Sequence, residues 1–174
     1  MIKYLIFIIS IAIAQEFLLD QNFGTVIIDD NTYDKPFLGG FNKPKVQWID
    51  WDEDQDDDLF LLDEDGHIKF FENKLLESSE FELISTNFFE LSNISWFFIG
   101  DFDDDNEYEI ITQNPDDIDQ MLYYDIVNSS VIEIGTVYDV MMNPVESDGV
   151  MNPTFVDIDN DEDLDFFTGN VVGT

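Results

Sequence analysis

The sequence contains no cysteine, so disulfide bonds cannot stabilise the fold. Basic residues are also scarce: 6 basic residues stand against 40 acidic ones, which gives a formal net charge of −34. A surface of this sign repels nucleic acids and anionic lipid headgroups, so neither is an expected partner. It also opposes its own compaction unless cations bind. With one histidine and no cysteine, the chain lacks the usual ligands of zinc.

Recognisable catalytic motifs are missing as well. The sequence has no Gly-x-Ser-x-Gly motif, no Cys/His pair and no phosphate-binding loop. His67 stands alone after a turn, where a surface or packing role is expected. The carboxylates are too numerous to define the two-residue site of a glycosidase. We therefore expect this chain not to be an enzyme.

The sequence has little that could cross a membrane. Lys3 precedes an apolar run from Tyr4 to Ile13, which is too short for a spanning helix. Ala12-Ile13-Ala14 is a small-x-small cleavage site. We predict that residues 1–14 are a signal peptide and that the mature chain, from Gln15, has no transmembrane segment and is secreted or held at the cell surface. A buried strand or a membrane anchor is the alternative for this run.

Apolar and aromatic residues, by contrast, are plentiful. They make up 44% and 15% of the 174 residues, which is more than a disordered acidic tail would contain. The length suits one ordinary domain. Short β-branched and aromatic segments alternate with turns, and no convincing long helix is expected. The sequence therefore predicts an all-β fold.

An acidic pattern of nine residues occurs three times, each time between two apolar segments. We call residues 50–58, 101–109 and 157–165 the first, second and third acidic loops. Each has a carboxylate at positions 1, 3, 5, 7 and 9. Alternate carboxylates in a tight loop converge on one centre, and calcium takes six to eight oxygen ligands. We predict three calcium sites with these ligands: Asp50, Asp52, Asp54, Asp56, Asp58, Asp101, Asp103, Asp105, Glu107, Glu109, Asp157, Asp159, Asp161, Asp163 and Asp165.

The spacing separates these loops from an EF-hand. An EF-hand needs a bidentate Glu at position 12, where this chain has Leu61, Thr112 and Thr168. Position 9 is expected to close the loop instead, and position 7 can contribute its backbone carbonyl. Magnesium suits the loops less well than calcium because it keeps several of its waters. Solvated acidic turns without metal are the other reading.

The spacing of the loops predicts the architecture. Their first aspartates are 51 and 56 residues apart, and four short strands fit into each interval. Such periods are typical of β-propeller blades, of which a closed ring needs about four to eight. We expect an incomplete propeller of four-stranded antiparallel blades, from a fragment or a broken reading frame. The expected parts are a lead-in at 15–45, blades at 46–92 and 93–150, and a partial blade at 151–174.

The stretch from Trp48 to Asn73, WIDWDEDQDDDLFLLDEDGHIKFFEN, resembles the FG-GAP/VCBS repeat of secreted and cell-surface propellers. So does Thr154 to Asn170, TFVDIDNDEDLDFFTGN. Integrin α-subunit propellers use a similar calcium loop. The chain departs from this pattern at position 6, where Gln55, Asn106 and Glu162 replace Gly.

The resemblance implies an extracellular calcium-binding module for binding or adhesion, with an extracellular protein or a carbohydrate as partner. The alternatives are the non-catalytic propeller part of a larger extracellular enzyme, such as a polysaccharide-degrading one, and a purely structural repeat. Among the aromatic residues, we expect Trp48 and Trp96 to pack between blades and Trp51, inside a loop, to be exposed.

Overall fold

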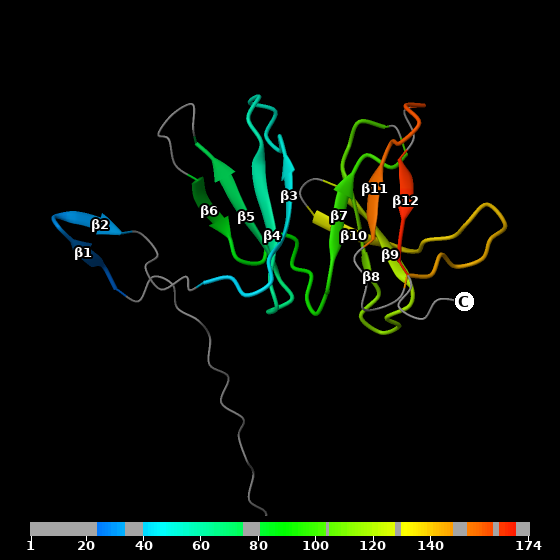
Figure 1. Cartoon of the computed structure of the whole chain (residues 1–174), viewed down its shortest axis with the longest axis horizontal. Coiled ribbons are helices and arrows are strands. Elements are labelled where there is room, and N and C mark those ends of the chain that lie inside the picture. Colours follow the sequence, from blue (N-terminus) through cyan, green and yellow to red (C-terminus); the bar gives the residue numbers. More distant parts are fainter. Residues whose placement is uncertain are drawn as a thin grey trace, which may run out of the picture. The chain divides into compact units, whose positions relative to one another are not determined.

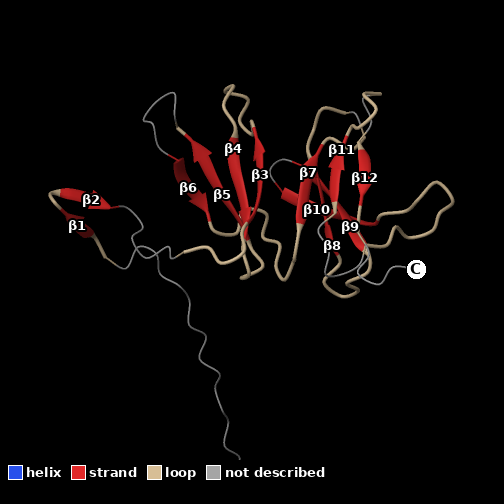
Figure 2. Cartoon of the chain, in the orientation of Figure 1, coloured by secondary structure: helices blue, strands red, loops and turns tan. Residues whose placement is uncertain are grey.

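The computed structural model describes residues 24–33, 40–74, 81–103, 105–127, 130–147, 153–161 and 164–169 (Figure 1). These ranges contain twelve strands and no helix, and all strand pairs are antiparallel (Figure 2). The all-β prediction is confirmed. None of the described residues forms a helix long and apolar enough to span a membrane. The predicted signal peptide at 1–14 lies outside the described residues.

The chain divides into two compact units, Met1–Gly40 and Phe41–Thr174. In the first unit, β1 (Val26–Ile28) pairs with β2 (Asn31–Tyr33). The two residues between these strands, Asp29 and Asp30, have φ of 50° and 65°, as expected for a two-residue hairpin turn.

The second unit contains two four-stranded sheets and one two-stranded sheet. The first sheet is formed by β3 (Lys45–Ile49), β4 (Asp58–Leu62), β5 (Ile68–Asn73) and β6 (Phe81–Ser85). The second sheet is formed by β7 (Phe97–Gly100), β8 (Glu109–Gln113), β9 (Met121–Val127) and β10 (Ser130–Thr136). The third sheet is formed by β11 (Thr154–Val156) and β12 (Asp165–Phe167). In each sheet the strands lie side by side in sequence order.

A tight turn shapes the middle of the first sheet. Gly66, between β4 and β5, has φ of 72°, and its N–H donates to the Asp63 carbonyl at 3.0 Å. A Cβ at this position would lie 3.1 Å from the backbone nitrogen of Asn93. Glycine is therefore required both for the left-handed conformation and for the close approach of the chain. Asp65 and Gly66 thus belong to the tight hairpin turn that joins β4 to β5.

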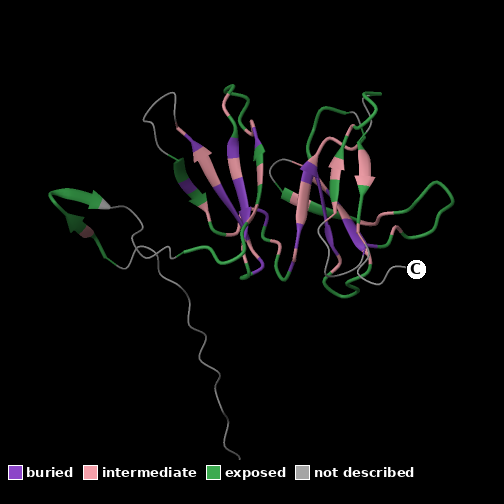
Figure 3. Ribbon diagram, viewed as in Figure 1, coloured by how far each residue is buried: buried purple, intermediate pink, exposed green. Residues whose placement is uncertain are grey.

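The first and second sheets pack face to face through one apolar core. Alternate residues of β4 and β5, among them Phe60 and Phe70, meet Ile99, Ile110 and Tyr124 of the second sheet in this core. Phe60 and Ile110 are fully buried. Figure 3 shows this burial along β4 and β8. Period-two alternation thus assigns one face of each sheet to the shared core.

The opposite face of the second sheet is also covered. Trp96, Ile111 and Met121 form a second core there, and Phe155 of β11 and Phe166 of β12 pack against it. The second sheet therefore lies between the first and the third. The sheets described here are open, so their assignment as propeller blades stays a prediction.

Two of the three tryptophan expectations are wrong. Trp96 is buried, as expected, with 3% of its surface exposed. Trp48 is 52% exposed because it lies on the face of β3 that points away from the second sheet. Trp51, expected to be exposed, packs into the core between the first and second sheets. Its ring contacts Phe60, with centroids 5.2 Å apart.

Candidate metal centre

Each acidic loop joins the first two strands of its sheet. The first follows β3, the second follows β7 and the third follows β11, and all three lie at the same end of the sheets (Figure 2). The first two loops touch, because Trp51 stacks on Tyr108 with ring centroids 5.7 Å apart. The strand pairs thus hold the first two acidic loops side by side.

The carboxylate at position 9 closes each loop onto its own beginning. Asp58 Oδ2 accepts the N–H of Trp51 at 3.2 Å. Glu109 Oε2 accepts the N–H of Phe102 at 2.8 Å. In the third loop, Asp165 and Ile158 make the same bond at 3.1 Å. Position 9 therefore has a structural function in all three loops.

The aspartate at position 1 holds the middle of each loop. Asp50 Oδ2 accepts the N–H of Gln55 at 3.1 Å, and Asp101 Oδ2 accepts that of Asn106 at 3.0 Å. Asp157 Oδ1 accepts the N–H of Asp161 at 3.2 Å. These bonds wrap the backbone around the first carboxylate, so that the following side chains converge on it.

Left-handed residues make these tight loops possible. At position 6, Gln55 has φ of 79° and Asn106 has φ of 66°; Glu162 lies outside the described residues. Position 4 is left-handed as well at Glu53 and Asn160, with φ of 62° and 63°. Asn tolerates this conformation, whereas the longer side chains of Gln and Glu incur a steric cost of roughly 1–2 kcal/mol each.

Replacing Gln55 with Gly is expected to stabilise the protein. The substitution relieves the strain at φ of 79°, and this gain exceeds the entropic cost of a glycine. The free energy of unfolding in urea should rise by about 0.5–1 kcal/mol. Gln55→Ala is the matched control: it keeps the Cβ and the strain, so its stability should stay close to that of the wild type. Equal gains in both variants would contradict this account.

Three groups of carboxylates have oxygens close enough to share one cation. They are Asp50, Asp52 and Asp54; Asp101, Asp103 and Glu109; and Asp157, Asp159 and Asp165. Within each group the oxygens lie within 4.8 Å of one another. Oxygens at this spacing can contact one ion at about 2.4 Å, which is a calcium–oxygen distance. The structure thus brings together nine of the fifteen predicted ligands in these three groups.

In the first loop, carboxylate oxygens are buried without partners. Asp50 Oδ1 and both carboxylate oxygens of Asp56 are shielded from solvent and accept no hydrogen bond from the described residues. Burial raises the pKa of Asp56, and the charges of Asp54, Asp52, Asp50 and Asp57 raise it further. Unpaired buried oxygens of this kind are costly unless a cation or proton neutralises them.

Asp58 lies outside the first of these three groups. It is buried, with 1% of its surface exposed, and its Oδ1 accepts the N–H of Asn73 at 2.7 Å. Asn73 also donates its side-chain N–H to the carbonyl of Asp57 at 3.0 Å. No pattern near Asn73 in the sequence predicts this role, which appears only once β5 lies beside β4. Asp58 and Asn73 therefore fasten the first loop to β5.

The other predicted ligands that the structure describes lie outside the three groups. Asp105 Oδ1 accepts the N–H of Glu107 at 2.8 Å, just as Asp54 Oδ1 accepts that of Asp56 at 3.0 Å. Asp161 is exposed at the tip of the third loop. Asp163 lies outside the described residues. Position 7 can still supply a backbone carbonyl in the first two loops.

Glu109 is the most strongly perturbed of the candidate ligands. It is 2% exposed, and burial raises its pKa from 4.5 to about 7. The hydrogen bond from Phe102 opposes this rise in pKa, whereas the nearby charges of Asp103, Asp105 and Asp101 add to it. Without a cation, Glu109 therefore holds a proton in the folded state at pH values where it is ionised in the unfolded state.

This perturbation predicts a pH-dependent stability without metal. Because the pKa of Glu109 is raised in the folded state, its contribution to the free energy of unfolding is fully present below pH 4.5 and is lost as the pH rises towards 7. Glu109→Gln should remove that loss. In urea unfolding with chelator, the free energy of unfolding of the variant should increase relative to that of the wild type as the pH rises from 5 to 8. A stability difference that does not change with pH would refute this prediction.

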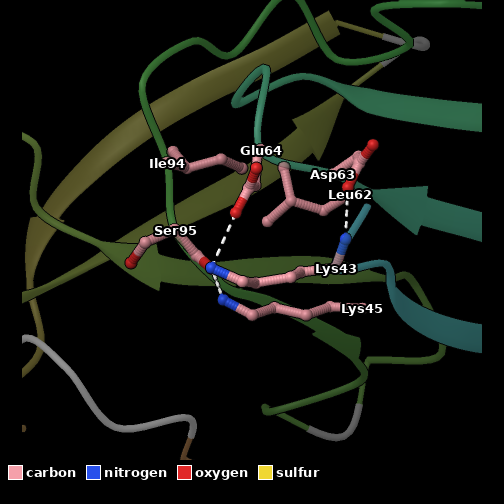
Figure 4. Close-up of a pocket in the computed structure, with 7 residues that line it drawn as sticks. All are labelled: Lys43, Lys45, Leu62, Asp63, Glu64, Ile94 and Ser95. Atoms are coloured by element: carbon pink, nitrogen blue, oxygen red, sulfur yellow. Dashed lines mark hydrogen bonds and ion pairs between the residues drawn. The ribbon is translucent and has the colours of Figure 1, made fainter. Parts of the chain in front are cut away.

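A cavity of about 290 Å³ lies at the other end of the β3–β4 hairpin (Figure 4). Two of the six basic residues line it. Lys43 Nζ is 2.7 Å from Glu64 Oε1, and Lys45 Nζ donates to the carbonyl of Ser95. Burial lowers the pKa of Lys45, and the charge of Lys43 adds to this effect. Both ammonium groups are thus engaged within the protein. The hydrogen bond from Lys45 to Ser95 links β3 to the segment before β7.

The fold and the site together define an all-β chain whose acidic groups could hold metal ions. No protein-family model matches the chain, and no curated protein or solved structure resembles it significantly.

Proposed function

We propose that the protein is an exported, calcium-binding module of the FG-GAP/VCBS propeller type, which binds an extracellular protein or carbohydrate. One observation carries the proposal: three loops at the same end of the sheets each hold three carboxylates whose oxygens lie within 4.8 Å of one another. Cations bound at these loops would stabilise the folded state of a chain with a net charge of −34, because they remove repulsion between the carboxylates within each loop.

The donor chemistry favours calcium over other cations. The three groups contain only carboxylates, and hard oxygen ligands suit calcium and magnesium. The additional carboxylates and backbone carbonyls of each loop bring the number of available oxygens towards the six to eight that calcium takes. Magnesium demands a near-ideal octahedron and keeps its waters, which an oxygen-rich loop suits less well.

The arrangement of the sheets supports the propeller part of the proposal. Each sheet carries its acidic loop between its first two strands, and neighbouring sheets pack face to face. In a propeller these sheets would be three of the roughly four to eight blades. Calcium would stabilise the loop between the first two strands of each sheet, and extracellular ligands would bind to other loops. Export depends on the predicted signal peptide at residues 1–14.

Calcium-dependent binding to extracellular molecules tests the proposal. The protein is applied to an array of polysaccharides and cell-surface proteins, once in calcium and once in chelator. We expect retention on at least one class of probe in calcium and its loss in chelator. Asp101→Asn with Asp103→Asn should weaken retention, whereas Asp116→Asn with Asp119→Asn, an equal change in charge outside the three groups, should leave it unchanged. Equal retention in both buffers would contradict the proposal.

A further inference from the structure

Residues two positions before each acidic loop occupy equivalent places in the three sheets. In the second sheet this residue is Ile99, which is 2% exposed because it faces the first sheet. In the third sheet it is Phe155, which packs on the second sheet, 4.9 Å from the ring of Phe98. In the first sheet it is Trp48, which is 52% exposed. In the second and third sheets, the preceding sheet covers this face. In the first sheet, the same face is exposed at Trp48.

The bare surface extends across the first sheet. Val46, four positions before the first loop, is 52% exposed, whereas its equivalent Phe97 packs against the core between the sheets. Phe81 of β6 is 42% exposed, and its ring meets that of Trp48 at 5.8 Å. We call Val46, Trp48 and Phe81 the leading face.

The third sheet has the opposite bare face. Phe60 of β4 and Ile111 of β8 each lie two positions after the end of their loop and are 0% and 4% exposed, because the following sheet covers them. Their equivalent in β12 is Phe167, which is 41% exposed. Val156, the equivalent of the buried Ile49, is 46% exposed. We call Val156 and Phe167 the trailing face.

The two bare faces are the two halves of a contact that the chain already makes twice. Between the first and second sheets, and again between the second and third, trailing positions of one sheet pack against leading positions of the next. We propose that a second copy of this chain docks head to tail, with its trailing face on the leading face of the first copy. Such a contact is heterologous, so further copies can add in the same direction or close a ring.

Electrostatic repulsion sets the conditions for this contact. Each copy has a formal net charge of −34, and repulsion between copies is screened over about 8 Å at 0.15 M ionic strength. The apolar faces themselves carry the attraction. Association should therefore strengthen as salt is raised, with or without calcium. This makes the inference independent of the proposed calcium-dependent function.

Analytical ultracentrifugation of the full chain at increasing protein concentration and moderate salt tests the inference. We expect the average mass of the wild type to rise above that of one chain. Trp48→Glu removes the leading face and Phe167→Glu the trailing face, so each variant alone should remain monomeric. Ile118→Glu is the control: Ile118 is 57% exposed but lies in a loop outside both faces, so this variant should associate like the wild type.

Mixing the two variants gives the sharpest result. Trp48→Glu keeps its trailing face and Phe167→Glu keeps its leading face, so an equal mixture should form a dimer and nothing larger. Val46→Glu, a second change in the leading face, should behave like Trp48→Glu. A monomeric wild type at every concentration, variants that still associate alone, or a mixture that remains monomeric would each overturn the proposal.

Discussion

Transfer of the protein from about 10 mM calcium into chelator is expected to lower its melting temperature by roughly 10–30 °C. Extracellular calcium modules bind with dissociation constants of about 10⁻⁴–10⁻³ M. A ten- to hundredfold excess then stabilises the folded state by roughly 1.4–2.7 kcal/mol at each site. For a chain of this size, each kcal/mol shifts the melting temperature by about 2–4 °C.

The structure explains why the cation should act on folding. In the first loop, Asp50 Oδ1 and both oxygens of Asp56 are buried and have no hydrogen-bond partner among the described residues, and in the second loop burial raises the pKa of Glu109 to about 7. The unfolded chain has neither problem, because its carboxylates are solvated and far apart. A cation bound to the folded loops therefore stabilises the folded state by mass action.

Removing one site should reduce the difference in melting temperature between calcium and chelator by about one third. Asp101→Asn with Asp103→Asn keeps the size of both side chains but eliminates the charges of the second group. Its melting temperature should fall in calcium but not in chelator, where the loss of repulsion offsets the change. The pair Asp116→Asn with Asp119→Asn should behave like the wild type in both buffers. Differential scanning calorimetry measures both, and a variant with an undiminished calcium shift would contradict the assignment.

Trp51→Ala is expected to reduce the free energy of unfolding by about 3 kcal/mol, a large part of the 5–15 kcal/mol typical of a domain. The indole lies against Phe60, Phe88 and Phe89 at 5.2–5.8 Å and stacks on Tyr108 at 5.7 Å. Its removal opens a cavity in the core between the first and second sheets and separates the first two acidic loops.

Trp48→Ala is the matched control for this loss. It removes the same side chain three residues away, but from a position that is 52% exposed on the leading face. At protein concentrations low enough to keep the chain monomeric, its cost in urea unfolding should be well under that of Trp51→Ala. Equal costs for the two substitutions would show that Trp51 does not anchor the loop in the core.

The local features of the fold could be predicted from the sequence. Alternating apolar residues around each loop predicted β3 and β4, β7 and β8, and β11 and β12, because strand periodicity and turn residues act over a few positions. The convergence of Asp50, Asp52 and Asp54 followed from their spacing alone. Asp65-Gly66 required a tight turn for reasons local to the backbone.

What the sequence could not predict depends on distant parts of the chain. Asp58 is held by Asn73, which is 15 residues away and reaches it only after β5 has paired with β4. Trp51 turns inward because Tyr108 and Phe89 form a pocket for it. The exposure of Trp48 depends on which side of the first sheet the second sheet covers. Alternation marks two faces of a strand but does not say which of them faces a neighbour.

The number of calcium ions bound per chain tests the central claim most directly. Isothermal titration of the metal-free wild type with calcium at neutral pH measures it without any assumption about stability or ligand. We predict three ions per chain, and two for Asp101→Asn with Asp103→Asn, with no comparable heat from magnesium. The absence of saturable calcium binding to the wild type would mean that the three acidic loops are solvated turns.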